Sequence, residues 1–464
     1  MLLALTTESL LKRTTSRCPV CHEPTPAEVI RVTTGKDAKV FLRKTCPQHG
    51  ASAVCIASDA RFYWMAQGDP QNACCGGTAC CASDDGQPGT LGRNAAGRGD
   101  APFETLSTCL ALIEIVNSCN LACPTCFADS PVGATGPKLD AIPLPDLQRR
   151  IDGVIARKGP IEILQLSGGE PTLHPDFFQL LAWTQAHPSI GYVLLNTNGV
   201  RIATDSDFSR RLAETFVERK FQLYLQFDGT AEPGQRELRG ADLRATREKA
   251  IRRCEEMRLP VTLAMTVTPE NLPNIWDTIE YGLRFTNVRG VAFQPMFLSG
   301  RTGREIQTNG ANGAIKPPVH RLNTADVILA AVAQSAGKLR FEDFTPLPCG
   351  DPNCATIGYL LKTPAGIRSV SDFIDFTKMH GFLHDKINYS LDDLSRCGCE
   401  DQPLAEILHA FELKESDTFR LFIKPFMDAW TWDQDRIDRC CTHVIRPDGQ
   451  LDSFCRYYSG FATP

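Results

Sequence analysis

Long apolar runs are missing from this chain of 464 residues. No uninterrupted run reaches the roughly 18 apolar residues of a membrane-spanning helix. Residues 1–12 lack the basic segment and the cleavage site of an export signal. An excess of positive charge is also missing: 49 Lys and Arg face 54 Asp and Glu, a net charge of −5 that supplies no field to attract nucleic acid. We therefore expect a cytoplasmic protein with no transmembrane segment and no nucleic-acid partner.

Cysteine, by contrast, is abundant and unevenly placed. Of 20 cysteines, eight lie at or before residue 81, four lie within 109–126, one lies within 127–348, and seven follow. Structural disulfides are disfavoured in the cytosol, so clustered cysteines there indicate metal ligands or catalytic thiols. A stretch at 82–102 is rich in Gly and polar residues and is typical of a linker.

The middle of the chain alternates short β-prone runs with helical patterns. Six candidate strands are Leu110–Val116, Ile161–Leu166, Tyr192–Asn196, Phe221–Phe227, Val261–Val267 and Gly290–Gln294. The intervals leave room for crossover helices such as Leu144–Arg157 and Arg244–Met257. This pattern predicts an α/β fold with a partial, TIM-like (βα)6 barrel, in which chemistry gathers at the C-terminal ends of the strands.

Three cysteines follow the first of these strands at close spacing. Cys119, Cys123 and Cys126 have three and then two residues between them, and Phe127 follows. Three thiolates can hold three irons of a [4Fe-4S] cluster and leave the fourth iron open. A zinc site is the alternative, but structural zinc needs a fourth nearby ligand. The loop CNLACPTCF resembles the signature of the radical S-adenosylmethionine (SAM) superfamily.

Later strand ends extend this resemblance. The resemblance implies that SAM and a [4Fe-4S] cluster are the cofactors, that the three cysteines are catalytic cluster ligands, and that Glu170 binds the SAM amino group. A glycine pair lets backbone approach a ligand closely, and each of these strand ends is also a common turn. The cofactor-binding residues expected by resemblance are Phe127, Gly168, Gly169, Glu170, Thr197, Asn198 and Asp228. Phe127 is expected either near the adenine or as a plug of the barrel mouth.

The N-terminal segment carries a second spacing of chemical interest. Cys18 and Cys21 form a CxxC pair, and Cys46 follows 25 residues later, as in a zinc ribbon or a rubredoxin-like mononuclear iron site. His49 and one cysteine of a pair at 74–75 compete for the fourth position. Free thiols in a loop-rich domain are the alternative. Two β-prone runs, Glu28–Val32 and Val40–Lys44, predict a hairpin between these cysteines.

The C-terminal segment has enough thiols for an auxiliary four-cysteine iron-sulfur cluster. The preferred ligands are Cys349, Cys354, Cys441 and Cys455, with Cys440 as a substitute for Cys441. Reduced structural thiols are the alternative. With the other motifs, this layout resembles one radical SAM group over nearly the whole chain, the group that includes archaeal tetraether lipid synthase and a dihydropterin methyltransferase. Members of that group carry further iron sites. The sequence departs from the group's pattern at 72–81.

We therefore expect an N-terminal cysteine-rich metal-binding domain (1–81), a Gly-rich linker (82–104), a radical SAM core (105–300) and an auxiliary-cluster domain (301–464). The expected reaction functionalises an unactivated carbon of a small molecule or lipid, by forming a carbon–carbon bond or by methylation, with a reduced ferredoxin or flavodoxin as electron donor. A lipid substrate would bring the protein to a membrane surface. Alternatives are a pterin or peptide substrate, and a zinc-stapled binding protein with structural cysteines only.

Overall fold

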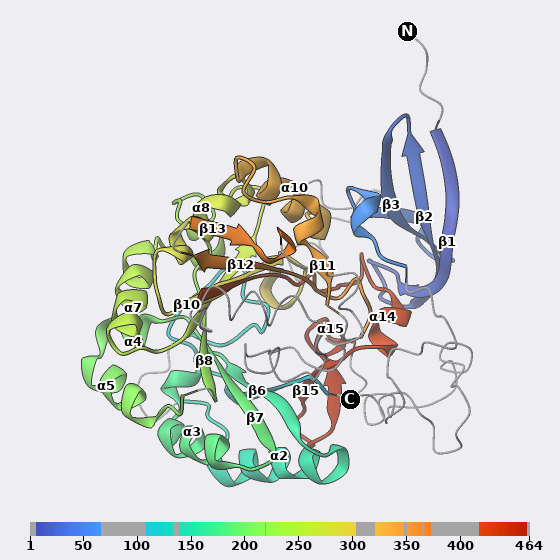
Figure 1. The fold of residues 1–464 in the computed structure, drawn as a ribbon. Helices are drawn as coiled ribbons and strands as arrows, with labels where there is room; N and C mark the ends of the chain where they lie inside the picture. The colour runs from blue at the N-terminus through green and yellow to red at the C-terminus, as the bar shows by residue number, and fades with distance from the viewer. Residues whose placement is uncertain are drawn as a thin grey trace, which may run out of the picture.

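The computed structural model describes eight stretches of the chain. They are residues 6–65, 108–132, 139–218, 220–302, 321–347, 350–363, 366–372 and 417–461. Within them the strands form two sheets, one of four strands and one of twelve (Figure 1). The predicted linker and Cys349 lie outside the described residues, and the proposed division into domains remains a prediction.

Six parallel strands form the centre of the larger sheet. In chain order they are β5 (Leu110–Val116), β6 (Ile161–Gly168), β7 (Ile190–Thr197), β8 (Phe221–Gln226), β9 (Val261–Val267) and β10 (Val288–Pro295). Each strand pairs in parallel with the next. The predicted partial barrel is therefore present, and the predicted strands differ from the observed ones by at most two residues at either end.

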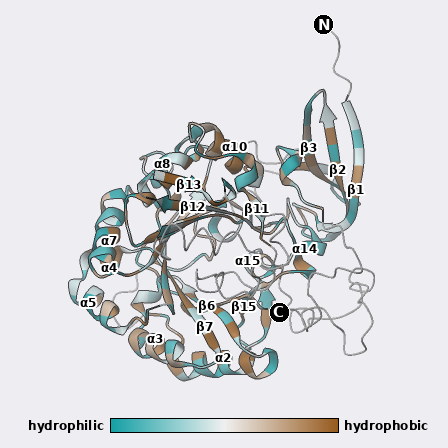
Figure 2. Ribbon diagram, in the orientation of Figure 1, coloured by the Kyte–Doolittle hydropathy of each residue, from teal (hydrophilic) through white to brown (hydrophobic). Residues whose placement is uncertain are grey.

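Helices connect these strands and cover the outer face of the barrel. The longer ones are α2 (Leu144–Lys158), α3 (Phe177–Ala186), α5 (Ser206–Thr215), α7 (Arg244–Glu256), α8 (Ile275–Leu283) and α10 (Thr324–Gln334). In α2 the buried residues Leu147, Ile151 and Val154 recur at helical spacing and face the sheet. The outward faces are largely hydrophilic (Figure 2). Short helices α4 (Val200–Thr204) and α6 (Gln235–Arg239) follow β7 and β8.

The barrel strands alternate between a helix-facing side and a polar interior side. In β8, Phe221, Leu223 and Leu225 belong to the main hydrophobic core, while Gln222 and Tyr224 line the interior cavity. This alternation is the two-residue period of a strand. It gives the barrel an apolar exterior that binds the helices and an interior that can hold a polar molecule.

The C-terminal segment extends this sheet at both ends. Strand β14 (Thr418–Ile423) pairs in parallel with β10, and β15 (Thr442–Ile445) pairs in parallel with β5. Eight parallel strands thus follow one another in the described part of the sheet. Antiparallel strands continue it: β11 (Thr345–Pro346), β12 (Thr356–Thr363), β13 (Gly366–Ser369) and β16 (Leu451–Ser453). The C-terminal segment therefore supplies strands to the barrel, which the sequence patterns did not predict.

The smaller sheet is antiparallel and contains the predicted hairpin. Its strands are β1 (Thr6–Arg17), β2 (Pro24–Thr34), β3 (Asp37–Cys46) and β4 (Gly50–Ala57), paired in that order. A small core of this sheet includes Val29 and Leu42 and packs against Trp430 of the C-terminal segment. Figure 1 shows β1 beside α14 (Gln434–Asp438). Among the described helices, none has the length and apolar character needed to cross a membrane.

Candidate active site and metal centres

A cavity of about 260 Å³ occupies the barrel interior and reaches the C-terminal ends of the strands. It brings together most of the predicted cofactor residues. Those that line it are Cys119, Cys123, Cys126, Phe127, Gly168, Gly169, Glu170, Thr197 and Asn198. They come from the ends of three consecutive strands, which is where a barrel of this type places its chemistry.

The loop that carries the three cysteines is held from several sides. The amide of Cys119 donates to the carbonyl of Pro131 at 3.0 Å, and Arg301 donates to the carbonyls of Cys123 and Ser130. Burial raises the pKa of the Cys119 thiol to about 12 and also raises that of Cys123. A bound metal would favour the thiolate form of both side chains.

Phe127 lies in an aromatic group at the cavity wall. Its ring contacts Tyr458 edge-on at a centroid distance of 4.9 Å, and Phe454 and Phe297 lie at 5.8 and 6.3 Å. The same ring lines the cavity. Both expected roles of Phe127, contact with the adenine and closure of the barrel mouth, are compatible with this position.

The glycine pair at the end of β6 is required because the backbone of the chain passes very close to it. A Cβ on Gly168 would lie 2.1 Å from the carbonyl oxygen of Val116, and a Cβ on Gly169 would lie 2.1 Å from that of Ser118. The amides of Gly169 and Glu170 donate to these same carbonyls. The pair thus lets β6 approach the start of the cysteine loop, whereas the sequence argument assigned the space to a ligand.

Glu170 is buried and ties the ends of β6 and β7 together. Its Oε1 accepts hydrogen bonds from the hydroxyls of Thr172 and Thr197, each at 2.7 Å, and its Oε2 accepts from the amide of Asn198 at 2.7 Å. Burial raises the pKa of this carboxyl, and these hydrogen bonds oppose the rise. Oε2 has one donor among the described residues, which leaves a lone pair for a cationic ligand in the cavity.

Asp228, just after β8, is paired with an arginine. It forms a two-point ion pair with Arg239, at 2.7 and 2.8 Å, and both side chains are buried. Arg239 lines the cavity, also interacts with Cys123, and carries a raised pKa because Asp228 and Cys123 outweigh the effect of burial. Arg239 is therefore a cavity-facing charge at this strand end, and it pairs with Asp228, the cofactor contact that the resemblance implies. An arginine eleven residues after Asp228 gives no local signal of this pairing.

A row of polar side chains, hydrogen-bonded to one another in separate groups, lines the barrel cavity. Gln165 donates to Asn196 at 2.5 Å, and Gln294 donates to the hydroxyl of Tyr224 at 2.9 Å. Gln222 accepts from Tyr192 at 3.1 Å and donates to Thr262. The lining members of the row, which face the cavity, are Gln165, Asn196, Gln222, Tyr224, Thr262 and Gln294.

The predicted N-terminal ligands lie together and are joined by His49. The sulfurs of Cys21 and Cys46 are 3.8 Å apart, and Nδ1 of His49 lies 3.6 Å from Cys18 Sγ and 3.5 Å from Cys46 Sγ. All four donor atoms lie within 4.8 Å of one another. A tetrahedral ion with metal–sulfur bonds of about 2.3 Å and metal–nitrogen bonds of about 2.0 Å requires edges of about 3.8 and 3.5 Å. The observed spacing fits one metal ion.

The C-terminal cysteines lie near enough to one another to interact electrostatically. Burial is the main cause that raises the pKa of Cys441 and of Cys455 to about 11, and charge on Cys354 adds to both. Charges on Cys441, Cys354 and Cys455 likewise add to the effect of burial in raising the pKa of Cys440. Among the described residues, only the N-terminal set meets the spacing of a single ion. Cys441 also lines the barrel cavity, and Cys349 lies outside the described residues.

The radical SAM superfamily profile matches residues 113–282, the stretch that carries the cysteine triplet and the strand ends described above. Residues 113–282 are thus a radical SAM superfamily domain. Such a domain implies a [4Fe-4S] cluster and SAM as cofactors. A second profile, the HMPTM N-terminal zinc ribbon domain, matches residues 10–58. This stretch includes all four donors of the N-terminal site.

Curated relatives include other radical enzymes. A 7,8-dihydro-6-hydroxymethylpterin dimethyltransferase from Methanocaldococcus jannaschii is 24% identical over 96% of this chain and 93% of its own length. A GTP 3′,8-cyclase from Synechococcus elongatus is 26% identical over 40% of this chain and 59% of its own length. The solved structure of Streptococcus suis SuiB bound to S-adenosylmethionine matches with a TM-score of 0.34 and 15% identity, over 46% of this chain and 44% of that one.

Proposed function

We propose that this radical SAM enzyme transfers methyl groups to a polar heterocycle of the pterin type. The observation that carries the proposal is the match to a dihydropterin dimethyltransferase over 96% of the chain, which includes both the N-terminal site and the C-terminal cysteines. Methylation of a carbon atom forms a carbon–carbon bond, so the proposal agrees with the reaction class expected from the sequence.

Residues around the cavity have distinct roles in this proposal. Cys119, Cys123 and Cys126 hold the cluster, and Glu170 and Asn198 bind the polar end of SAM. When bound, these cofactors supply a 5′-deoxyadenosyl radical that abstracts hydrogen from a carbon atom. Gly168, Gly169, Thr197 and Phe127 shape the remaining SAM site. The chain's own part is to fix the ligands, exclude water and orient one carbon of the substrate toward the radical.

The polar row inside the barrel supports a heterocyclic substrate. A pterin ring presents amide-like donors and acceptors in one plane, and Gln165, Asn196, Gln222 and Gln294 offer matching groups to the cavity. A saturated lipid chain would offer no hydrogen bond to these amides, which already pair with other side chains of the barrel, and would leave their remaining donor and acceptor sites unused. We therefore favour a pterin-type ring over a lipid chain, and with it a cytoplasmic location over a membrane surface.

Two further metal sites belong to the proposal. Cys18, Cys21, Cys46 and His49 would hold one zinc or iron ion, because their donor atoms have tetrahedral spacing. His49 would take the fourth position, for which the cysteines at 74–75, outside the described residues, are the other candidates. The C-terminal group, Cys354, Cys440, Cys441 and Cys455, with Cys349, would supply the ligands of an additional iron-sulfur cluster. A reduced ferredoxin or flavodoxin would supply electrons.

The test is an anaerobic assay with purified, iron-loaded protein. We expect iron-sulfur absorption, formation of 5′-deoxyadenosine from SAM and dithionite, and transfer of a deuterated methyl group from labelled SAM to 7,8-dihydro-6-hydroxymethylpterin, read by mass spectrometry. Cys126→Ala should abolish 5′-deoxyadenosine formation, whereas Cys55→Ala, which changes a cysteine of β4 away from the cluster loop, should not.

Two results would contradict the proposal at different levels. A protein that contains zinc but no iron-sulfur cluster would favour the zinc-stapled binding protein. A protein that makes 5′-deoxyadenosine and labels phospholipid in vesicles, but not the pterin, would favour the lipid reaction instead.

A further inference from the structure

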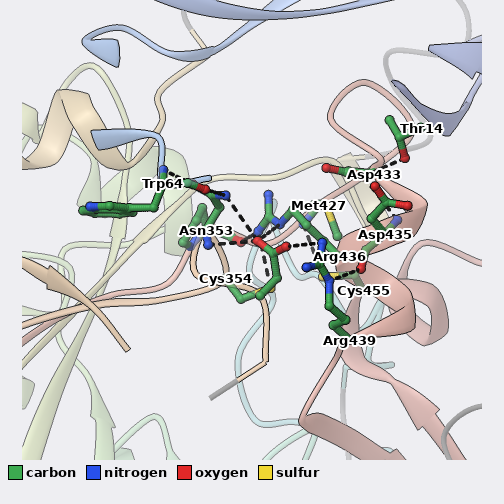
Figure 3. Close-up of polar contacts among 12 residues, drawn as sticks. Thr14, Trp64, Asn353, Cys354, Met427, Asp433, Asp435, Arg436, Arg439 and Cys455 are labelled. Carbon is green, nitrogen blue, oxygen red and sulfur yellow. Dashed lines mark hydrogen bonds and ion pairs between the residues drawn. The ribbon is translucent and has the colours of Figure 1, made fainter. Parts of the chain in front are cut away.

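The loop Gly350–Cys354 is held rigidly beside the C-terminal cysteines (Figure 3). Asp351 is buried in this loop and accepts a hydrogen bond from the amide of Asn353 at 2.9 Å. Arg439 pairs with its other carboxylate oxygen at 2.9 Å. A Cβ at Gly350 would lie 2.6 Å from the carbonyl oxygen of Arg439. The loop therefore fits closely against the α14 segment, which fixes the position of the Cys354 sulfur.

The same loop is anchored to the N-terminal part of the chain. Asn353 donates from its side-chain amide to the carbonyl of Trp64 at 2.8 Å and accepts from the amide of Trp64 at 2.9 Å. Cys354 itself donates from its amide to the carbonyl of Asp351 at 2.9 Å, which closes a turn. The sulfur of Cys354 thus sits on a backbone that has little freedom to move.

Arg436 brings a buried positive charge to this sulfur. Its Nη2 donates to Cys354 Sγ at 3.7 Å and to the carbonyl of Pro425 at 3.4 Å, and the side chain is only 11% exposed. The guanidinium is charged, because arginine is not deprotonated in proteins. Its Nε forms an ion pair with Asp351 at 4.0 Å but has no hydrogen-bond acceptor among the described residues.

We propose that Arg436 sets the reduction potential of the cluster that Cys354 helps to hold. This inference rests on the second cluster of the proposed function, and it assigns a role to a residue of α14 that binds no iron. Reduction adds one negative charge to a cluster, and a fixed cation that donates to a ligand sulfur stabilises the reduced state. Because the guanidinium is largely enclosed and also donates to the carbonyl of Pro425, its effect on the sulfur does not require reorganisation when the electron arrives.

Arg439 provides a matched comparison within the same structure. It pairs with the same carboxylate of Asp351 and donates to the carbonyl of Asp435 at 3.0 Å, and in the described part of the chain no hydrogen bond joins it to a sulfur. Loss of Arg439 should loosen the loop without removing a donor from Cys354. Loss of Arg436 should remove both an ion pair with Asp351 and the donor to Cys354.

The test is an anaerobic redox titration of full-length, iron-loaded protein, followed by electron paramagnetic resonance. Cys119, Cys123 and Cys126 are changed to Ala in every variant, so that only the second cluster is observed. Arg436→Gln should make reduction at least tenfold less favourable, which is a shift of about 59 mV to lower potential for one electron. Arg439→Gln should change the equilibrium less than threefold. Arg436→Lys, which keeps the charge, should lie between the wild-type side chain and Gln.

Each result bears on a separate claim. An Arg436→Gln cluster with unchanged potential would overturn the inference, and so would an equal shift in Arg439→Gln, because loop stability would then be the cause. If Arg436→Gln does not fold, Arg436→Lys decides: a potential equal to that of the parent overturns the role of sulfur contact. A parent protein without any second iron-sulfur signal would overturn both the inference and the second cluster. A shift as expected, with no methylation of pterin by the native enzyme, would support the inference and contradict the proposed substrate.

Discussion

Replacing Lys44 by Met should separate the N-terminal sheet from the C-terminal segment. Lys44 lies on β3 and is 2% exposed. Its Nζ donates to the carbonyls of Ala429 and Trp430 at 2.6 and 2.9 Å, to the carbonyl of Arg17 at 2.9 Å, and to the hydroxyl of Ser16 at 3.0 Å. Methionine keeps the length and the apolar stem of the side chain but donates no hydrogen bond.

The expected loss follows from the groups left without a donor. Three buried carbonyls lose their partner, and a buried acceptor without a partner costs about 1–3 kcal/mol. Removal of the buried charge offsets part of this cost. We expect the free energy of unfolding to fall by about 3–5 kcal/mol, a large part of the 5–15 kcal/mol typical of folded proteins.

Urea unfolding followed by tryptophan fluorescence measures this loss, because Trp430 packs against the core of the N-terminal sheet. Hydrogen exchange of the amides at 429–437 should accelerate at the same time. Lys39→Met is the control, since Lys39 is on the same strand and exposed; it should change stability by less than about 0.5 kcal/mol. Metal content is measured in both variants, because Cys46 is a neighbour on the strand. Equal stability of the two variants at equal metal content would refute the reasoning.

Three further predictions concern the metal sites and the barrel. Gly169→Ala places a Cβ 2.1 Å from the carbonyl oxygen of Ser118, so iron content and SAM binding, measured by titration, should fall at least tenfold. Gly153→Ala in α2 is the control and should leave both unchanged, because its Cβ would lie 3.4 Å from Nη1 of Arg157. Cys21→Ala should remove one equivalent of zinc or iron by elemental analysis and leave the iron-sulfur absorption. Burial raises the pKa of Glu114, so folded protein keeps a proton that unfolded protein releases; the free energy of unfolding should fall as pH rises above about 4.5, and Glu114→Gln should remove that slope.

Local patterns in the sequence were sufficient for the barrel strands and the cysteine triplet. Strands β5 and β9 were predicted to the residue, because apolar β-prone runs with turn residues at their ends give strong local signals. Strands β14 and β15 were not predicted, because their pairing with β10 and β5 is decided by tertiary contacts between segments distant in the chain.

Side chains with buried charge were the other omission. Arg239, Arg436 and Lys44 each occupy a buried position that a sequence pattern assigns to the surface, because long charged residues are usually exposed. Their partners are distant in the chain or depend on a turn: Asp228 lies eleven residues before Arg239, and Ala429 lies 385 residues after Lys44. Contacts of this kind follow from the fold and have no spacing that could predict them.

The pairing of β15 with β5 also has a consequence for synthesis of the chain on the ribosome. Thr442 pairs with Leu110, so the first barrel strand waits for its outer neighbour until more than 300 further residues have emerged. During that time one edge of β5 has unpaired backbone groups and can associate with other chains. Such distant pairing slows folding, because a long loop must close before contacts form. Nascent protein thus has a long period in which the barrel is open at the outer edge of β5.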